Sequence, residues 1–123
     1  MSFDDVYADP DEVLARVEAD ARRSEERAAK MPAFEAALAQ VRGEAVSPRR
    51  DIRLEVDSTG RVTALRISEP ALGRGAQRLS HEILGLIRAA EADSRRATLE
   101  SVEQLLGPDD PITRQLRSAG PTA

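Results

Sequence analysis

The sequence has 123 residues but no cysteine, no tryptophan, one histidine and only three aromatic side chains. Without cysteine the chain cannot form disulfides, thiolate zinc sites, iron–sulfur clusters or a cysteine nucleophile. The single histidine excludes a His-rich metal site and leaves His81 as the one possible base of a Ser-His-Asp triad. No apolar run approaches the roughly 18–20 residues that span a bilayer, and no signal-peptide core follows Met1. These absences predict a cytoplasmic protein with no membrane partner.

Motifs of known chemistry are also lacking. The sequence HEILG at His81 begins like a helical metalloprotease box, but Gly85 stands where the second histidine must lie. Residues 73–75 (GRG) lack the third glycine of a dinucleotide fingerprint. The only lysine, Lys30, is not followed by the serine or threonine of a phosphate-binding loop. We therefore expect no enzymatic activity, no cofactor and no metal.

The net charge of −4 argues at first against a nucleic-acid partner, because such proteins usually carry a basic surface. Residues 1–12, however, hold five acidic side chains and no basic one, and the rest of the chain has 18 basic and 17 acidic side chains. Of the 18 basic residues, 17 are arginine, which binds phosphate and carboxylate groups through a planar, bidentate fork. Acidity therefore does not exclude a DNA partner.

Residues 10–43 have the pattern of one long helix. Asp9 suits the N-cap, and Pro10 suits the first helical position. Pro32 lacks an N–H group and is expected to kink or restart the helix, and Gly43 is expected to end it. Apolar or small residues recur three and four positions apart, as in a coiled-coil seam: Val13, Val17, Ala21, Ser24, Ala28, Met31, Leu38 and Val41.

The length of this helix predicts a homodimer. About 30 helical residues at a rise of about 1.5 Å make a rod of roughly 45 Å, which is longer than a small domain is wide. The rest of one compact chain cannot cover such a stripe, so a partner helix is the simplest way to bury it. We expect the dimer interface to contain Val17, Ala21, Ala28, Met31 and Leu38.

After this helix the periodicity changes from helical to alternating. Ile52, Leu54 and Val56 are expected on the buried face of a strand, with Arg53 pointing outward. The sequence DSTG that follows is a hairpin signal in which Gly60 can take a positive φ.

Residues 62–67 are expected to form the next strand, with Leu65 on its apolar face. Regular alternation from Leu65 would place Val62 on the opposite face, which predicts a β-bulge near residues 63–64. Residues 44–47 add a short first strand. Because three strands with one apolar face need a helical cover, the sheet requires a helix downstream.

Apolar residues recur at helical spacing over residues 79–106, which predicts that covering helix. Two starts of this helix fit the sequence: one capped by Ser80, and an earlier one around residues 75–76. The fold class is therefore α+β, in the order α-β-β-β-α, with long helical arms.

The domain organisation follows from the same pattern. One domain over residues 13–107 is expected between an acidic N-terminal segment, residues 1–12, and a C-terminal tail, residues 108–123. The tail holds three prolines and one glycine, which predicts a flexible segment.

Several stretches carry a resemblance to a known family. They are residues 39–45, 52–57 and 60–67, Leu72 in the turn that follows, and Leu79, Ile83, Ile87, Ala90 and Ala97. Through these residues the chain resembles the YbaB/EbfC family of small nucleoid-associated proteins over roughly residues 13–106. Two features depart from the family pattern: the first helix is rich in Ala, Glu and Arg instead of Met and Gln, and the loop around Arg49 is plainer than the family's Gly-rich loop.

The resemblance implies a homodimer whose sheets join and whose helices project as arms around duplex DNA. It implies a nucleoid-associated protein that binds double-stranded DNA with little sequence preference. The sequence is also similar to actinobacterial YbaB-like proteins that accompany type VII secretion systems. The alternative is therefore a protein-interaction module that docks on a protein partner without binding DNA.

The arginines are the candidate DNA ligands, acting on backbone phosphates because no module for reading bases is present. The predicted contacts lie in two groups, one about the sheet and one on the first helix: Arg49, Arg50, Arg53 and Arg61, and Arg22, Arg23 and Arg27. Carboxylates three or four residues away, such as Glu18 and Glu25, can instead pair with the helical group.

Overall fold

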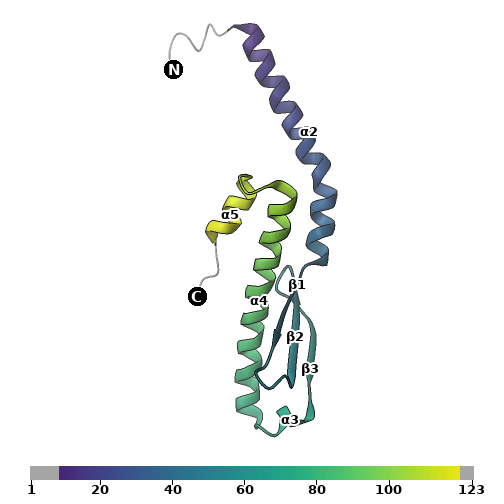
Figure 1. The fold of residues 1–123 in the computed structure, drawn as a ribbon, viewed down its shortest axis with the longest axis vertical. Helices are drawn as coiled ribbons and strands as arrows, with labels where there is room; N and C mark the ends of the chain where they lie inside the picture. The colour runs from purple at the N-terminus through teal and green to yellow at the C-terminus, as the bar shows by residue number, and fades with distance from the viewer. Residues whose placement is uncertain (1–8, 120–123) are drawn as a thin grey trace. The chain divides into compact units, whose positions relative to one another are not determined.

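The computed structural model describes residues 9–119 of the chain (Figure 1). Its elements are α2 (Pro10–Gln40), β1 (Arg42–Val46), β2 (Ile52–Asp57), β3 (Val62–Ile67), α3 (Glu69–Leu72), α4 (Ala76–Leu106) and α5 (Pro111–Ala119). This order confirms the α+β class and the predicted succession of helix, three strands and helix. The chain divides into two compact units, Met1–Pro32 and Ala33–Ala123.

Helix α2 begins where the sequence predicts. The N–H of Asp11 donates to the Asp9 carboxylate at 3.0 Å, so Asp9 caps the first turn. None of the α2 residues is buried. The helix does not restart at Pro32, because one missing backbone donor does not stop a helix of 31 residues. It ends at Gln40, so Val41, expected in the helical seam, instead lies buried just after the helix.

Gly43 is in β1, and the expectation that it ends the first helix is wrong. A Cβ atom at this position would collide with the carbonyl oxygen of Ala90 and would lie 2.5 Å from the backbone nitrogen of Ser94. Both of these atoms belong to the backbone of α4. The next residue adds a hydrogen bond, since the N–H of Glu44 donates to Asp93 at 2.9 Å. Glycine is therefore required here by close packing of a strand on a helix.

The three strands form one antiparallel sheet in the order β1-β2-β3. Helix α4 packs on β1 and β2, as Figure 1 shows. The core lies between them and consists of Ala45, Ile52, Leu54, Val56, Ala71, Leu86 and Ala90. Arg53 is exposed on the opposite face of the sheet, as predicted.

Strand β3 is exposed along its whole length. Val56 pairs with Val62 and Glu55 with Ala64, so Thr63 is the extra residue of the predicted bulge. The bulge brings three apolar side chains onto the core-facing side of the sheet. These are Val62, Leu65 and Ile67, which are 42%, 45% and 38% exposed. Since α4 packs mainly on β1 and β2, this strip of β3 stays partly exposed within the part of the chain that the structure describes.

Helix α4 begins at Ala76, after Gly75 with a φ of 90°, which confirms the earlier of the two predicted starts. Ser80 does not cap it, because its hydroxyl donates to the Ala76 carbonyl inside the first turns. None of the helices within residues 9–119 is long and apolar enough to cross a membrane.

The structure has a helix, α5, in the segment that was expected to be a flexible tail. Thr113 is buried, and its hydroxyl donates to the Gly107 carbonyl at 2.7 Å. The hydrogen bond and the packing of α5 on α4 outweigh the local signal of the prolines. Residues 1–8 of the acidic segment and residues 120–123 lie outside the described residues, and the predicted domain bounds at 13 and 107 stay predictions.

Two glycine substitutions test the packing of β1 on α4. Gly43→Ala forces strand and helix backbones apart and is expected to lower the free energy of unfolding by about 1–3 kcal/mol. Gly85→Ala is the matched control, since no atom lies within 4 Å of a Cβ built there in the middle of α4. It should raise the free energy of unfolding by about 0.5–1 kcal/mol. Urea unfolding at one protein concentration measures both, and equal effects would contradict the packing argument.

Candidate nucleic-acid interface

The turn between β1 and β2 presents two arginines. The N–H of Arg50 donates to the Ser47 carbonyl at 2.8 Å, and Pro48 occupies the second position of this turn, where its fixed φ is favourable. Arg49 and Arg50 are both exposed. Arg50 has a φ of 61° and is the one non-glycine residue with positive φ in the described part of the chain. This left-handed conformation costs a residue with a Cβ atom roughly 1–2 kcal/mol.

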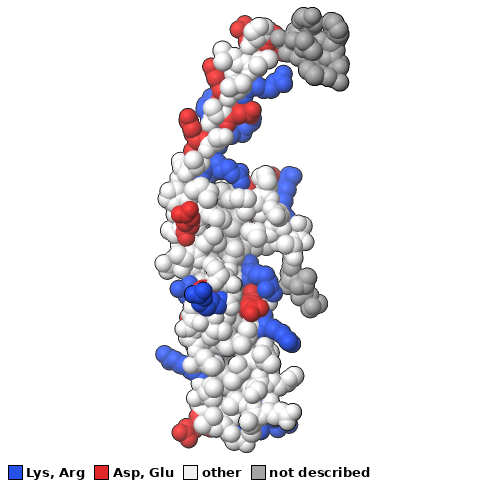
Figure 2. Space-filling view, turned by 180° about the vertical axis from the view of Figure 1, so that it is seen from behind, with Lys and Arg blue, Asp and Glu red and all other residues white. Residues whose placement is uncertain are grey.

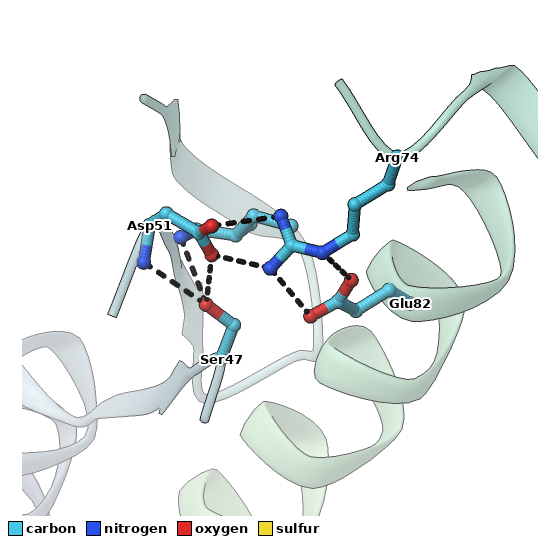
Figure 3. Close-up of polar contacts among 5 residues, drawn as sticks. Ser47, Asp51, Arg74 and Glu82 are labelled. Carbon is cyan, nitrogen blue, oxygen red and sulfur yellow. Dashed lines mark hydrogen bonds and ion pairs between the residues drawn. The ribbon is translucent and has the colours of Figure 1, made fainter. Parts of the chain in front are cut away.

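A buried ion pair lies beneath this turn (Figure 3). Arg74 donates two parallel hydrogen bonds to the Asp51 carboxylate, both at 2.7 Å, and its Nε lies 3.2 Å from Glu82. The Ser47 hydroxyl donates to Asp51 at 2.8 Å. Ser47 and Asp51 are 2% and 8% exposed. The ion pair thus joins the β1–β2 turn to the segment that leads from α3 into α4.

The ionisation of this pair is fixed at neutral pH. The hydrogen bonds from Arg74 lower the pKa of Asp51 from 3.8 to about 2 against the opposing effect of burial, and the Ser47 hydroxyl adds to the lowering. The same hydrogen bonds raise the pKa of Arg74. Because the Arg74 guanidinium is engaged by the carboxylates of both Asp51 and Glu82, it is not free to bind a ligand.

The outer face of the sheet carries two arginines directly opposite each other. Arg53 of β2 pairs in register with Arg66 of β3, and both are exposed. Within residues 9–119 no carboxylate pairs with either of them, and like charges in this position repel. Both lie at the end of the sheet where the β1–β2 turn lies. We call Arg49, Arg50, Arg53 and Arg66 the arginine patch.

Three arginines of α4 and α5 differ from the patch because they are paired with carboxylates, whereas Arg78, Arg88 and Arg95 of α4 are exposed and have no carboxylate partner among residues 9–119. The pairs are Arg96 with Asp93 and Glu100, Arg117 with Glu103, and Arg114 with Asp109. Hydrogen bonding from Arg96 lowers the pKa of Asp93. The charges of Arg96, Arg114 and Arg117 are thus compensated, whereas those of the patch are not.

The structure brings together three of the four arginines predicted about the sheet. Arg61 is exposed but lies at the β2–β3 turn, at the opposite end of the sheet from Arg49, Arg50 and Arg53. Arg66 takes its place in the patch. It was missed because only the strand register, which the sequence does not give, places Arg66 opposite Arg53.

The predicted helical group lies on α2, in the Met1–Pro32 unit. Arg22 is exposed, Arg23 forms an ion pair with Asp20, and Arg27 is half-buried and has an interaction partner. Arg23 is thus paired along the helix, but with Asp20 and not with the predicted Glu18 or Glu25. On the face drawn in Figure 2, acidic and basic side chains alternate along this part of α2.

The residues expected in the dimer interface lie on the surface of α2. Val17 is 58% exposed, Ala21 and Ala28 are exposed, and Met31 and Leu38 are half-buried. Nothing in the described part of the single chain covers the seam completely. Among residues 9–119, no group of three or more acidic or histidine side chains is placed to hold a metal ion.

The fold and the surface define an α+β protein whose sheet has one bare face that carries arginines. The model of the YbaB/EbfC DNA-binding family matches residues 14–108, and the chain therefore belongs to that family. This confirms the resemblance predicted from the sequence. No curated protein and no solved structure matches the chain.

The acid stability of the protein tests the buried ion pair. Because the folded-state pKa of Asp51 lies below its ordinary value of 3.8, its ionised form stabilises the fold above about pH 4. That contribution is lost as the pH falls from about 4 to 2. Asp51→Asn is expected to be less stable than the wild type at pH 7 and to lose less stability between pH 4 and 2. Unfolding midpoints at several pH values measure this, and parallel pH profiles would contradict it.

Proposed function

We propose that the protein binds duplex DNA through backbone phosphates, with little sequence preference, as a nucleoid-associated cytoplasmic homodimer. The observation that carries this proposal is the arginine patch, whose four guanidinium groups are exposed and unpaired within residues 9–119 of a chain from a DNA-binding family. Arginine forms charge-assisted, bidentate hydrogen bonds with phosphate. Phosphate contacts position a protein on DNA but carry no base information, so the binding is sequence-tolerant.

The overall charge supports weak, salt-sensitive binding. Residues 33–123 hold 13 basic and 13 acidic side chains, while residues 1–32 hold five basic and nine acidic ones. A chain with this balance attracts DNA only where its arginines are uncompensated. The affinity must therefore come from a few phosphate contacts, and it must fall as salt rises because each contact releases counterions.

The exposed strand β3 supports the homodimer. Val62, Leu65 and Ile67 form a partly exposed apolar strip, and one edge of β3 has no strand partner in the described part of the chain. Uncovered apolar patches and open sheet edges are typical of association surfaces. A dimer through β3 would join two sheets and present two arginine patches. No observation favours the alternative, a protein-docking module, in the same way.

A salt titration with matched variants tests the phosphate contacts. Wild-type protein should bind unrelated short duplexes with similar affinity, which falls steeply with salt. Arg53→Ala/Arg66→Ala is expected to weaken binding about tenfold or more and to reduce the salt slope by about one for each arginine–phosphate interaction that the substitutions remove. Arg114→Ala/Arg117→Ala makes the same change in net charge at paired arginines on α5 and should have little effect. Fluorescence anisotropy measures these affinities, and equal losses in the two variants would contradict the assignment of the patch.

The dimer is tested separately by the mass in solution. Light scattering at micromolar concentration is expected to give twice the chain mass of 13.4 kDa. Leu65→Asp places a charge in the β3 strip and should yield monomers, whereas Val46→Asp, on the outer face and 40% exposed, should leave the dimer intact. Circular dichroism checks that both variants fold. A monomeric wild type would overturn the proposed dimer.

A further inference from the structure

The two hairpin turns have the same hydrogen-bonding pattern but different residues at the left-handed position. In the β2–β3 turn the N–H of Gly60 donates to the Asp57 carbonyl at 3.0 Å, and Gly60 has a φ of 86°. In the β1–β2 turn the equivalent bond runs from Arg50 to Ser47, and Arg50 has a φ of 61°. Glycine adopts this conformation without steric cost, whereas arginine does not. A strained non-glycine residue needs surrounding structure that holds it in place.

The buried contacts below the turn supply that structure. The Ser47 hydroxyl oxygen accepts hydrogen bonds from the N–H groups of Asp51 and Ile52, at 3.1 and 3.0 Å, and donates its proton to the Asp51 carboxylate. Asp51 is in turn held by the bidentate fork of Arg74, which is anchored to α4 through Glu82. The two ends of the turn are thus tied to each other and to the helix.

The same residue also fixes the end of β3. The carbonyl oxygen of Asp51 accepts a hydrogen bond from the N–H of Ser68 at 2.7 Å. Ser68 is two residues after Arg66, which belongs to the patch. Asp51 therefore links the turn that carries Arg49 and Arg50 with the strand that carries Arg66.

We propose that Asp51 and Arg74 are positioning residues of the phosphate-binding surface, which hold Arg49 and Arg50 in the turn ready for a DNA phosphate. The inference rests on the proposed function. Arg74 does not act as a ligand, because its side chain is 10% exposed and is engaged by two carboxylates. A turn held in advance binds more tightly because it loses less conformational freedom when the ligand arrives.

A double-mutant cycle in DNA binding separates positioning from general stability. Arg74→Lys keeps the positive charge but cannot form the bidentate fork. It is expected to weaken binding about fivefold in the wild-type background. In a background of Arg49→Ala/Arg50→Gly, which lacks both guanidinium groups and has the residue best suited to positive φ, Arg74→Lys should cause no further loss. Equal losses in both backgrounds would overturn the proposal.

Amide hydrogen exchange without DNA gives a readout that does not depend on binding. Arg74→Lys should speed exchange of the Arg50 N–H and leave exchange of the Gly60 N–H unchanged. Ser47→Ala, which retains the Asp51–Arg74 pair, provides a second variant with the same expected direction should Arg74→Lys not fold. Normal exchange at Arg50 in a folded variant would overturn the positioning while leaving the DNA function standing. Failure of the wild type to bind duplex DNA at low salt would overturn both.

Discussion

The close approach of β1 to α4 at Gly43 determines how the rest of the Ala33–Ala119 part is arranged. Because this glycine has no side chain, the strand reaches the backbone of the helix beside Ala90 and Ser94. The helix is therefore centred on β1 and β2, and its apolar residues pack against Ile52 and its neighbours. One helix cannot also cover the third strand. Strand β3 keeps an apolar strip exposed, and the opposite face of the sheet stays bare.

These two uncovered surfaces differ in chemistry, and each suits a different partner. The strip on β3 is apolar and flanks an open edge, so burying it stabilises an association between chains. The outer face and the adjoining turn carry guanidinium groups, which remain hydrated and favour an anionic partner. Arg96, Arg114 and Arg117 are engaged by carboxylates, so these three arginines contribute less charge for binding than the unpaired arginines of the patch.

The parts of the fold that depend on local chemistry could be predicted from the sequence. Alternation of apolar residues located β2 and gave β3 with its observed bounds. The position of Val62 in that alternation located the bulge, and the turn chemistry at Gly60 gave its positive φ. Gly43 was wrongly assigned because a glycine after a helix is the same local signal whether it ends the helix or allows close packing. The helix α5 was missed because its stability comes from contacts with α4.

The candidate site was harder to predict because its parts are far apart in the sequence. The exposed arginines could be listed from composition, but only strand register places Arg66 opposite Arg53. Asp51 and Arg74 are 23 residues apart, and no local pattern connects an aspartate in a hairpin with an arginine between two glycines. Such long-range polar pairs depend on the tertiary structure.

The buried ion pair also explains how a chain with net charge −4 can attract a phosphate at this turn. Screening at 0.1 M salt limits the reach of a surface charge to about 10 Å, so a phosphate responds to nearby groups more than to the net charge. Asp51 is the one carboxylate within the turn itself, and an unpaired carboxylate there would oppose Arg49 and Arg50. The Arg74 guanidinium binds it from the buried side and is shared with Glu82, so that three arginines (Arg49, Arg50 and Arg74) against two carboxylates leave a net charge of +1 at the turn. The same contact that holds the turn in shape therefore also leaves the exposed face of the turn positively charged.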